Sequence, residues 1–291
     1  MKIKRLTSTL GLAGYLLGFC LLATQSSGAI YTLAASGDIL SASDGTTTLA
    51  DAITANAGTM PSGTTVVIPT GFAATMQGFN GVDSTDTIIN VDGSSTLTAI
   101  GNNNADRTQT VTINIKDSAQ YLLDSDHKVR ADLVLNYDSS AASSSAGKLT
   151  FQSSTTQSTT INLNSGSLIF GEISLAKAGE FNLNGGDLSF AAINTLTASA
   201  PGFIDFNSAA GSVLTFTGAS ALTDLDVNIG FGMFQIDGVS QTSIASWSRV
   251  LDGTTLTLTP TPVPEPSTYA LLLGLAAFGF LTFHRRSHRG C

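Results

Sequence analysis

A short alternating motif that recurs about every twenty residues constrains this chain more than any other feature. The motif is a turn residue followed by a strand of the form Leu-x-Phe, and it occurs at residues 147–151, 166–170, 186–190 and 212–216 (Ser-Val-Leu-Thr-Phe in the last copy). A second apolar segment, ending in Asn, precedes each copy at residues 133–136, 161–164, 181–184 and 204–207. Alternation places Leu and Phe on one face of a strand. A repeat of this length predicts rungs that bury their apolar faces against their neighbours.

Two arrangements of these units fit the pattern. The segment Asn184-Gly185-Gly186 could close a hairpin, which would give an antiparallel sandwich or barrel. Alternatively, each Asn marks a corner of a parallel β-solenoid, and equivalent residues stack along its axis. In either arrangement, the Ser- and Ala-rich residues 139–146 are predicted to form a projecting low-complexity loop.

The region before the repeats favours the solenoid. Residues 48–56 have an apolar face at helical spacing, and Thr48 with Asp51 forms a capping-box pattern. A strand at residues 65–68 follows. The helical segment resembles the Leu-x-x-Ala-Ile-x-x-Ala-Asn start of right-handed β-helix proteins of the pectin-lyase type, although Ala50 stands where those proteins usually have Arg. The resemblance implies a helix that plugs the first rung, and it implies no activity.

We therefore expect an all-β fold, a parallel β-helix or solenoid over residues 30–258 with one N-terminal capping helix as its only helix. Further rungs are expected at residues 87–91, 96–100 and 111–115, with a last strand at 254–258. Three repeat residues are expected to point into the core, namely Phe170, Phe190 and Phe216. Trp247 could stack on a sugar, but core packing is the favoured interpretation.

The first 29 residues show the three parts of a secretory signal peptide. A basic start at Lys2, Lys4 and Arg5 precedes an apolar stretch from Leu10 to Ala23 and a small-residue exit. We expect cleavage after Ala29. A first transmembrane helix is the alternative, but an apolar run of 14 residues is short for a bilayer, and polar residues follow it.

Three elements follow one another at the C-terminal end. They are a Pro-rich linker at 259–267, an apolar run at 268–283 that is expected to cross the membrane, and a basic cytoplasmic tail at 284–291. The linker holds the motif Pro264, Glu265 and Pro266, and the tail holds the stop-transfer residues Arg285, Arg286 and Arg289. This order closely resembles the PEP-CTERM sorting signal of exopolysaccharide-producing Gram-negative bacteria. The resemblance implies that an exosortase in the inner membrane recognises the Pro-Glu-Pro element and that the tail is removed.

Processing at both ends would also remove both cysteines. Cys20 lies in the signal peptide and Cys291 in the tail, so the mature chain would depend on its core rather than on disulfides. We expect the protein to be exported, to be held transiently at the inner membrane by its C-terminal helix, and then to reach the cell surface or extracellular matrix.

The distribution of charge excludes one class of partner. Six of the 13 basic residues lie in the terminal segments, so residues 30–262 hold seven basic residues against 20 acidic ones. Such a surface does not attract phosphate, and nucleic-acid binding is not expected. Nothing in the sequence indicates a cofactor.

The densest ionisable cluster comprises Asp124, Asp126, His127, Lys128, Arg130 and Asp132. Polysaccharide lyases on the β-helix fold use calcium-binding Asp residues and a basic side chain that abstracts a proton. The competing interpretation is a charged loop at one edge of the sheet, and we favour it because the mature chain has no second His to form a pair. No catalytic residue is assigned.

Asp-x-Asp pairs occur in this cluster and again at Asp224 and Asp226. On a strand, both carboxylates of such a pair would point the same way, and their oxygen atoms would suit calcium. Two carboxylates do not complete a site, so no metal site is assigned.

The sequence thus predicts an exported, exosortase-sorted structural protein of the surface or matrix, associated with exopolysaccharide or biofilm. Its Ser, Thr and Asn side chains would hydrogen-bond hydrated exopolysaccharide without a pocket. Two other classes stay open: a polysaccharide lyase or hydrolase that uses residues 124–132, and an adhesin that binds a specific glycan.

Overall fold

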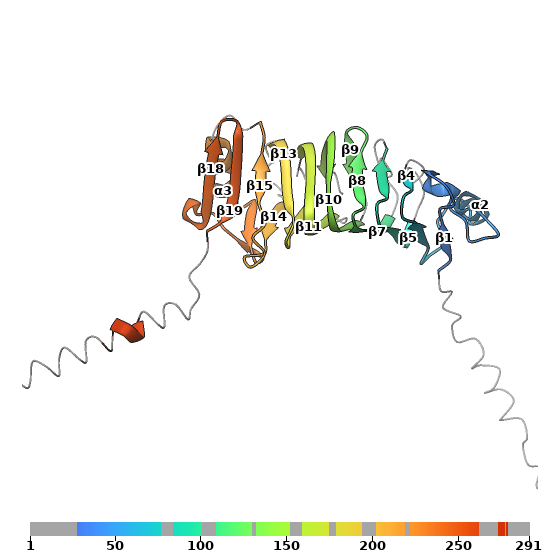
Figure 1. The fold of residues 1–291 in the computed structure, drawn as a ribbon, viewed down its shortest axis with the longest axis horizontal. Helices are drawn as coiled ribbons and strands as arrows, with labels where there is room; N and C mark the ends of the chain where they lie inside the picture. The colour runs from blue at the N-terminus through green and yellow to red at the C-terminus, as the bar shows by residue number, and fades with distance from the viewer. Residues whose placement is uncertain are drawn as a thin grey trace, which may run out of the picture.

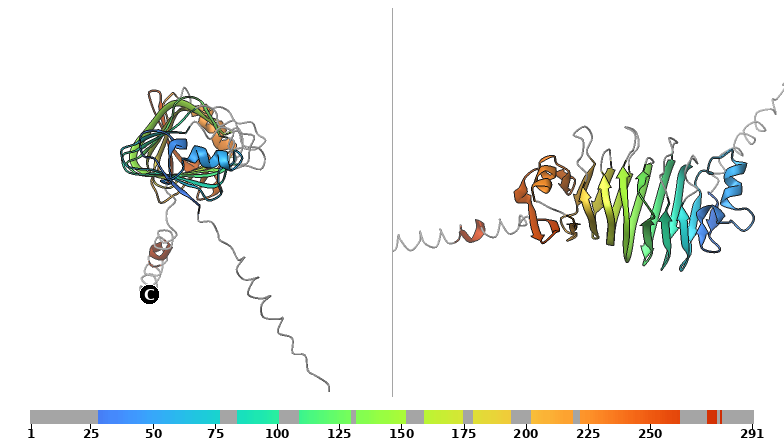
Figure 2. Two further views of the ribbon diagram at one scale, coloured as in Figure 1. Left: turned by 90° about the vertical axis from the view of Figure 1, so that its right-hand side faces the viewer. Right: turned by 90° about the horizontal axis from the view of Figure 1, so that it is seen from above.

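The computed structural model describes residues 28–76, 84–100, 109–129, 132–151, 159–174, 179–193, 202–218, 222–261, 273–276 and 278. Between residues 28 and 261 these form an all-β rod, which runs from a helical N-terminal end to a C-terminal cap (Figure 1). Viewed along its axis, the rod has a closed outline (Figure 2). The predicted solenoid is therefore confirmed.

The strands fall on successive faces of the rod. The first face consists of β1 (Ile30–Thr32), β3 (Thr65–Ile68), β5 (Ser84–Val91), β7 (Gln109–Asp117), the starts of β10 (Asp132–Phe151) and β11 (Thr159–Ser174), β12 (Gly179–Leu183), β14 (Phe203–Phe206) and β16 (Phe234–Ile236). The second consists of β2 (Gly37–Asp38), β4 (Ala73–Met76), β6 (Thr96–Ala99), β8 (Gln120–Leu123), the middles of β10 and β11, β13 (Asp187–Ile193) and β15 (Leu214–Phe216). A third, shorter face begins with β9 (His127–Val129), which pairs with the end of β10.

Except between β8 and β10, neighbouring strands along these faces pair in parallel. The hairpin alternative is therefore wrong for the repeats, since Asn184-Gly185-Gly186 connects β12 to β13 on the next face. Because the strands stack in parallel, the inward-facing apolar residues of each strand lie next to the equivalent residues of the strand one turn away.

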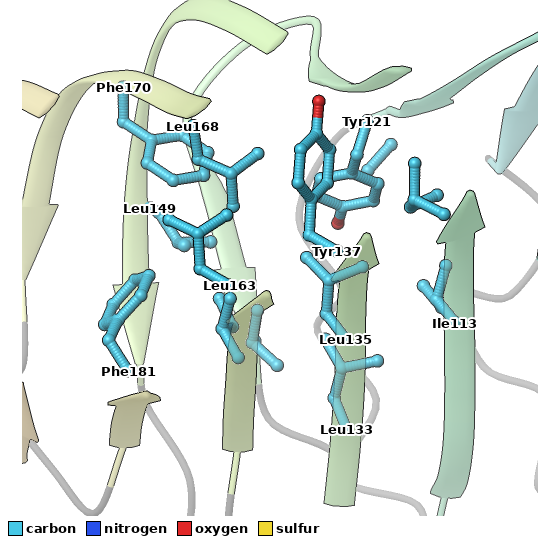
Figure 3. Packing of buried hydrophobic residues seen from close by; sticks show 14 of the residues in the cluster. Ile113, Tyr121, Leu133, Leu135, Tyr137, Leu149, Leu163, Leu168, Phe170 and Phe181 are labelled. Carbon is cyan, nitrogen blue, oxygen red and sulfur yellow. The ribbon is translucent and has the colours of Figure 1, made fainter. Parts of the chain in front are cut away.

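Alternation along the strands produces one continuous core. Its buried residues run from Tyr31 near the first rung to Leu258 near the last. Figure 3 shows part of this core, which includes Ile113, Tyr137 and Phe181. The register aligns Phe170 with Phe190, and Phe190 with Phe216, and all three are buried as predicted. The rings of Phe190 and Phe216 meet edge to face with centroids 4.8 Å apart, which adds a directional contact to apolar burial.

The predicted N-terminal helix is confirmed as α2 (Leu49–Ala55). Thr48 is its N-cap, and the hydroxyl of Thr48 accepts a hydrogen bond from the backbone N–H of Asp51. Leu49 and Ile53 are buried in the core, so the helix covers the first rung. A short 3-10 helix, η1 (Ile39–Ser41), packs beside it.

The expectation of a single interior helix is wrong, because α3 (Leu222–Gly230) lies in the C-terminal cap. Leu225 and Ile229, four residues apart, are buried and attach this helix to the core. This cap also abandons parallel pairing: β17 (Val239–Ser240) pairs antiparallel with β16, and β18 (Trp247–Asp252) with β19 (Thr255–Pro260). A second 3-10 helix, η2 (Ile244–Ser246), precedes Trp247. Trp247 packs edge to face against Phe206 and Phe234 in the core, in agreement with the core-packing interpretation.

The loop expected at residues 139–146 is instead part of β10. Ser143 and Ser145 are buried and face β8, where the backbone ladder between the two strands is replaced by side-chain hydrogen bonds. The Ser143 hydroxyl accepts from the N–H of Tyr121 at 2.9 Å, and the Ser145 hydroxyl accepts from the N–H of Leu123 at 2.8 Å. The serine run therefore joins two sheets, and its low complexity reflects alternation of buried and exposed small residues.

Replacing Ser143 and Ser145 together by alanine should destabilise the rod by about 2–4 kcal/mol, since each change leaves a buried backbone N–H without its acceptor. Urea unfolding followed by circular dichroism measures the change. Ser144→Ala is the matched control, because Ser144 lies between them and is exposed. If the double variant matched the control, the hydroxyls would not join the sheets.

Candidate functional site

The charged cluster predicted around residue 127 occupies the connection between β8 and β9. Asp124 and Asp126 are exposed in that turn, whereas His127 is buried beneath it. A carboxylate oxygen of Asp126 accepts a hydrogen bond from the backbone N–H of Lys148, one turn along the rod, at 3.0 Å. Arg130 and the side chain of Lys128 lie outside the described part of the chain. In the described part, the cluster is thus a turn tied to the next rung.

The Asp-x-Asp interpretation is wrong in its geometry for both pairs. Asp124 and Asp126 lie in a turn, and Asp224 and Asp226 lie in α3, so neither pair sits on a strand. In a helix, residues two apart do not face each other. Asp226 instead forms an ion pair with Arg249 of β18. Among the described residues, no group of three His, Cys, Asp or Glu side chains is placed to hold a metal ion.

A ladder of five asparagines runs along the outward side of the first face. Its members are Asn90, Asn114, Asn136, Asn162 and Asn182. Each amide N–H₂ donates to the amide oxygen of the preceding member, at 2.8–2.9 Å. Each asparagine is partly buried, and the sequence separations are 24, 22, 26 and 20 residues, which gives the length of each turn.

The ladder confirms that asparagines stack along the axis, but the predicted alignment was off by two residues in one unit. Asn136 pairs in register with Asn162 and not with Asn164, which instead bonds Asn184 at the edge of the face. The Leu-x-Phe copy at 147–151 is displaced too, because Ser143 and Ser145 align with Leu168 and Phe170. Irregular register along β10 allows these shifts, and the sequence period alone does not reveal them.

The ladder ends where the next residue in register cannot donate. That residue is Asp205, and its carboxylate accepts the backbone N–H of Gly238 at 3.0 Å. The amide oxygen of Asn182 faces this position, is buried, and has no hydrogen-bond partner in the described structure. The three middle amides, those of Asn114, Asn136 and Asn162, each use one N–H and one lone pair within the ladder, which leaves their second N–H and lone pair for solvent or a ligand.

Replacing Asn136 by alanine should destabilise the rod by about 1–2 kcal/mol, because it removes two side-chain hydrogen bonds from the middle of the ladder. Chemical denaturation measures the loss. Thr160→Ala, in the neighbouring outward column, provides the control. Equal midpoints for the two variants would show that the ladder adds nothing to stability.

The carboxyl groups with clearly shifted pKa values lie at opposite ends of the rod. Hydrogen bonds from the Thr47 N–H and from Thr46 lower the pKa of Asp44 to about 2, and bonds from Ser208 lower the pKa of Asp237. Lowered values mean that these bonds support the fold at neutral pH and are lost as the pH falls through the lowered pKa. Burial raises the pKa of Tyr137, whose hydroxyl donates to the Ala141 carbonyl inside the rod. These groups stabilise turns and core.

The predicted processing residues have different positions relative to the described structure. Ala29 precedes β1, and its carbonyl accepts the N–H of Thr65 at 3.0 Å, so cleavage after it would release a chain that starts with the first strand. Residues 1–27 of the predicted signal peptide and the predicted sorting and stop-transfer residues lie outside the described residues. Residues 273–276 and 278 are helical, but no helix within the described part is long and apolar enough to cross a membrane.

The described residues form a parallel β-solenoid with a helical N-terminal cap and an antiparallel C-terminal cap. The chain continues from the C-terminal cap beyond Thr261. Residues 262–286 match the PEP-CTERM protein-sorting motif. The match includes Pro264, Glu265 and Pro266 as well as Arg285 and Arg286, and it stops short of Arg289. No curated protein and no solved structure matched the chain.

The sorting motif confirms the resemblance seen at the C-terminal end. It indicates export and a C-terminal, membrane-anchored sorting step, and it implies recognition by an exosortase. It covers 25 residues of 291 and therefore concerns the destination of the chain rather than the activity of the rod.

Proposed function

We propose that the protein is a structural component of the cell surface or extracellular matrix, in which the rod associates with exopolysaccharide. The observation that carries the proposal is the coupling of a sorting motif to a rod with one uninterrupted core. Stacked rungs make a stiff spacer, because each turn buries its apolar face against the next.

The outward faces suit hydrated polymers. The asparagine ladder is flanked by columns that contain Thr112 and Thr160 on one side, and Asn184 and Asn207 on the other. Amides and hydroxyls arranged at the spacing of the strands offer repeated donors and acceptors to a chain lying along the axis. The excess of acidic over basic residues in residues 30–262 favours binding of neutral rather than anionic polysaccharide.

Exchange of the rod tests this role. Residues 30–258 are replaced by an unrelated soluble domain, and both terminal segments are kept. The exchanged protein should still be sorted, whereas the matrix should retain less exopolysaccharide and become mechanically weaker. A matrix indistinguishable from that of the wild type would exclude a structural role for the rod.

A carbohydrate lyase that uses residues 124–132 is the second candidate, and we expect no such activity. The purified protein should release no unsaturated product from pectate or alginate, with or without calcium. Product that accumulated and then disappeared in Lys128→Ala and Arg130→Ala would establish the lyase instead. Binding to a glycan array without cleavage would favour an adhesin.

A further inference from the structure

The exposed apolar residues of the rod are concentrated at one end. Eight large apolar side chains are exposed among the described residues between 28 and 261, and only Ile30 and Ile88 lie outside the C-terminal cap. The other six are Val227, Phe231, Val239, Ile244, Val250 and Leu251. We call these six residues the apolar cap surface.

The six residues belong to α3 and to the segments that follow it in the C-terminal cap, at the C-terminal end of the rod (Figure 1). Val227 is in α3 and Phe231 follows it directly. The carbonyl of Gly232 accepts a hydrogen bond from the hydroxyl of Ser240, beside Val239. Ile244 lies in η2, which contacts α3, and the ion pair between Asp226 and Arg249 connects α3 to β18, the strand that also contains Val250 and Leu251.

Such a surface differs from the opposite end of the rod. There α2 buries its apolar face and the exposed residues around it are polar or small, as expected of a cap that faces water. Clusters of exposed apolar side chains mark contact sites for proteins or membranes. We therefore expect the exposed apolar side chains of the C-terminal cap to contact another apolar surface.

The segment that follows Thr261 places an apolar run close to the C-terminal cap. Seven residues separate Thr261 from Tyr269, the first apolar residue of the run at 268–283, and even a fully extended segment of that length reaches only about 25 Å. While that run is anchored, Thr261 stays within about this distance of the bilayer. Thr261 belongs to the cap, where its N–H donates to the carbonyl of Ser246. The described apolar residues of that run, Leu273, Leu275 and Phe278, are exposed and do not cover this surface.

We propose that the apolar cap surface rests on the lipid bilayer while the protein is anchored for sorting. Phe231, Val250 and their neighbours would enter the interface, with a strength that follows the apolar area they bury. The ion pair leaves Asp226 and Arg249 mutually neutralised, and the exposed Asp237 and Asp252 favour zwitterionic over anionic lipid. The proposal rests on the membrane-anchored step and is independent of any role in the matrix.

Fluorescence quenching tests the contact on the full-length chain, purified from a host without an exosortase so that the tail is retained. In a Cys20→Ser, Cys291→Ser background, a probe is attached at Phe231→Cys, at Val250→Cys or at the exposed N-terminal control Thr46→Cys. The protein is inserted into phosphatidylcholine vesicles that carry a spin-labelled lipid. Quenching at 231 and 250 should exceed that at 46 by at least about twofold.

A second variant separates contact from mere proximity. Adding Phe231→Ser and Val227→Ser to the Val250→Cys protein should lower quenching toward the control, whereas adding Thr242→Ser, an exposed change on the same cap, should not. Equal quenching at all three positions would overturn the proposal. Protection of the probe at 250 in detergent that rose with protein concentration would also overturn it, because the surface would then join two copies of the chain.

Discussion

Replacing Phe190 by alanine should lower the free energy of unfolding of the rod by about 3–5 kcal/mol, the range expected for truncation of a fully buried Phe. The Phe190 side chain is 0% exposed and stacks between Phe170 and Phe216 in consecutive turns. The loss would combine the apolar area, the cavity that remains and the edge-to-face contact with Phe216.

Urea denaturation followed by circular dichroism and by tryptophan fluorescence measures this change. Two probes are needed because a rod built of similar turns can unfold in parts. Ser189→Ala is the matched control, since Ser189 is adjacent in β13 but points outward. A loss below about 1 kcal/mol for Phe190→Ala would mean that the Phe column contributes little to stability, in conflict with its burial.

The parts of the fold that the sequence predicts well are those governed by local pattern. The alternation in Leu-x-Phe determines which side chains are buried, and its period determines that strands recur once per turn. The capping pattern at Thr48 and Asp51 likewise identifies α2 and its start. These signals depend on neighbours in the chain, so a single sequence contains them.

The features that escaped prediction depend on partners one turn away. Ser143 and Ser145 look like loop residues until the N–H groups of Tyr121 and Leu123 are placed beside them. The pairing of Asn136 with Asn162 depends on register shifts inside β10. For α3, the spacing of Leu225 and Ile229 is a usable signal, but the Asp-x-Asp pair at Asp224 and Asp226 draws attention to a strand instead.

The candidate sites divide in the same way. The sorting residues are recognisable from sequence, because the enzyme that recognises them meets a linear motif. The apolar cap surface was not recognisable, since Val250 and Leu251 in a strand near the end of the domain look like core residues. Their exposure follows from the position of β18, which pairs with β19 alone.

Changing Pro264, Glu265 and Pro266 together to alanine should abolish surface delivery almost completely and leave uncleaved protein in the inner membrane. Proline fixes φ and lacks a backbone donor, so two prolines around Glu265 favour an extended segment without backbone pairing. An enzyme can bind such a segment without first unfolding a helix or strand. Alanine at these three positions removes both the preference for an extended backbone and the carboxylate of Glu265.

Mass spectrometry of the membrane and surface fractions decides the outcome. The triple variant should retain Cys291 in the membrane fraction, whereas Thr261→Ala, just outside the matched motif, should be processed as the wild type is. Deletion of all residues after Ser267 should release a soluble protein that bypasses sorting, because the apolar run and its arginines would no longer place the motif at the outer face of the inner membrane. If the wild-type surface protein still contained residues 269–291, the C-terminal segment would be a permanent anchor and its removal during sorting would be disproved.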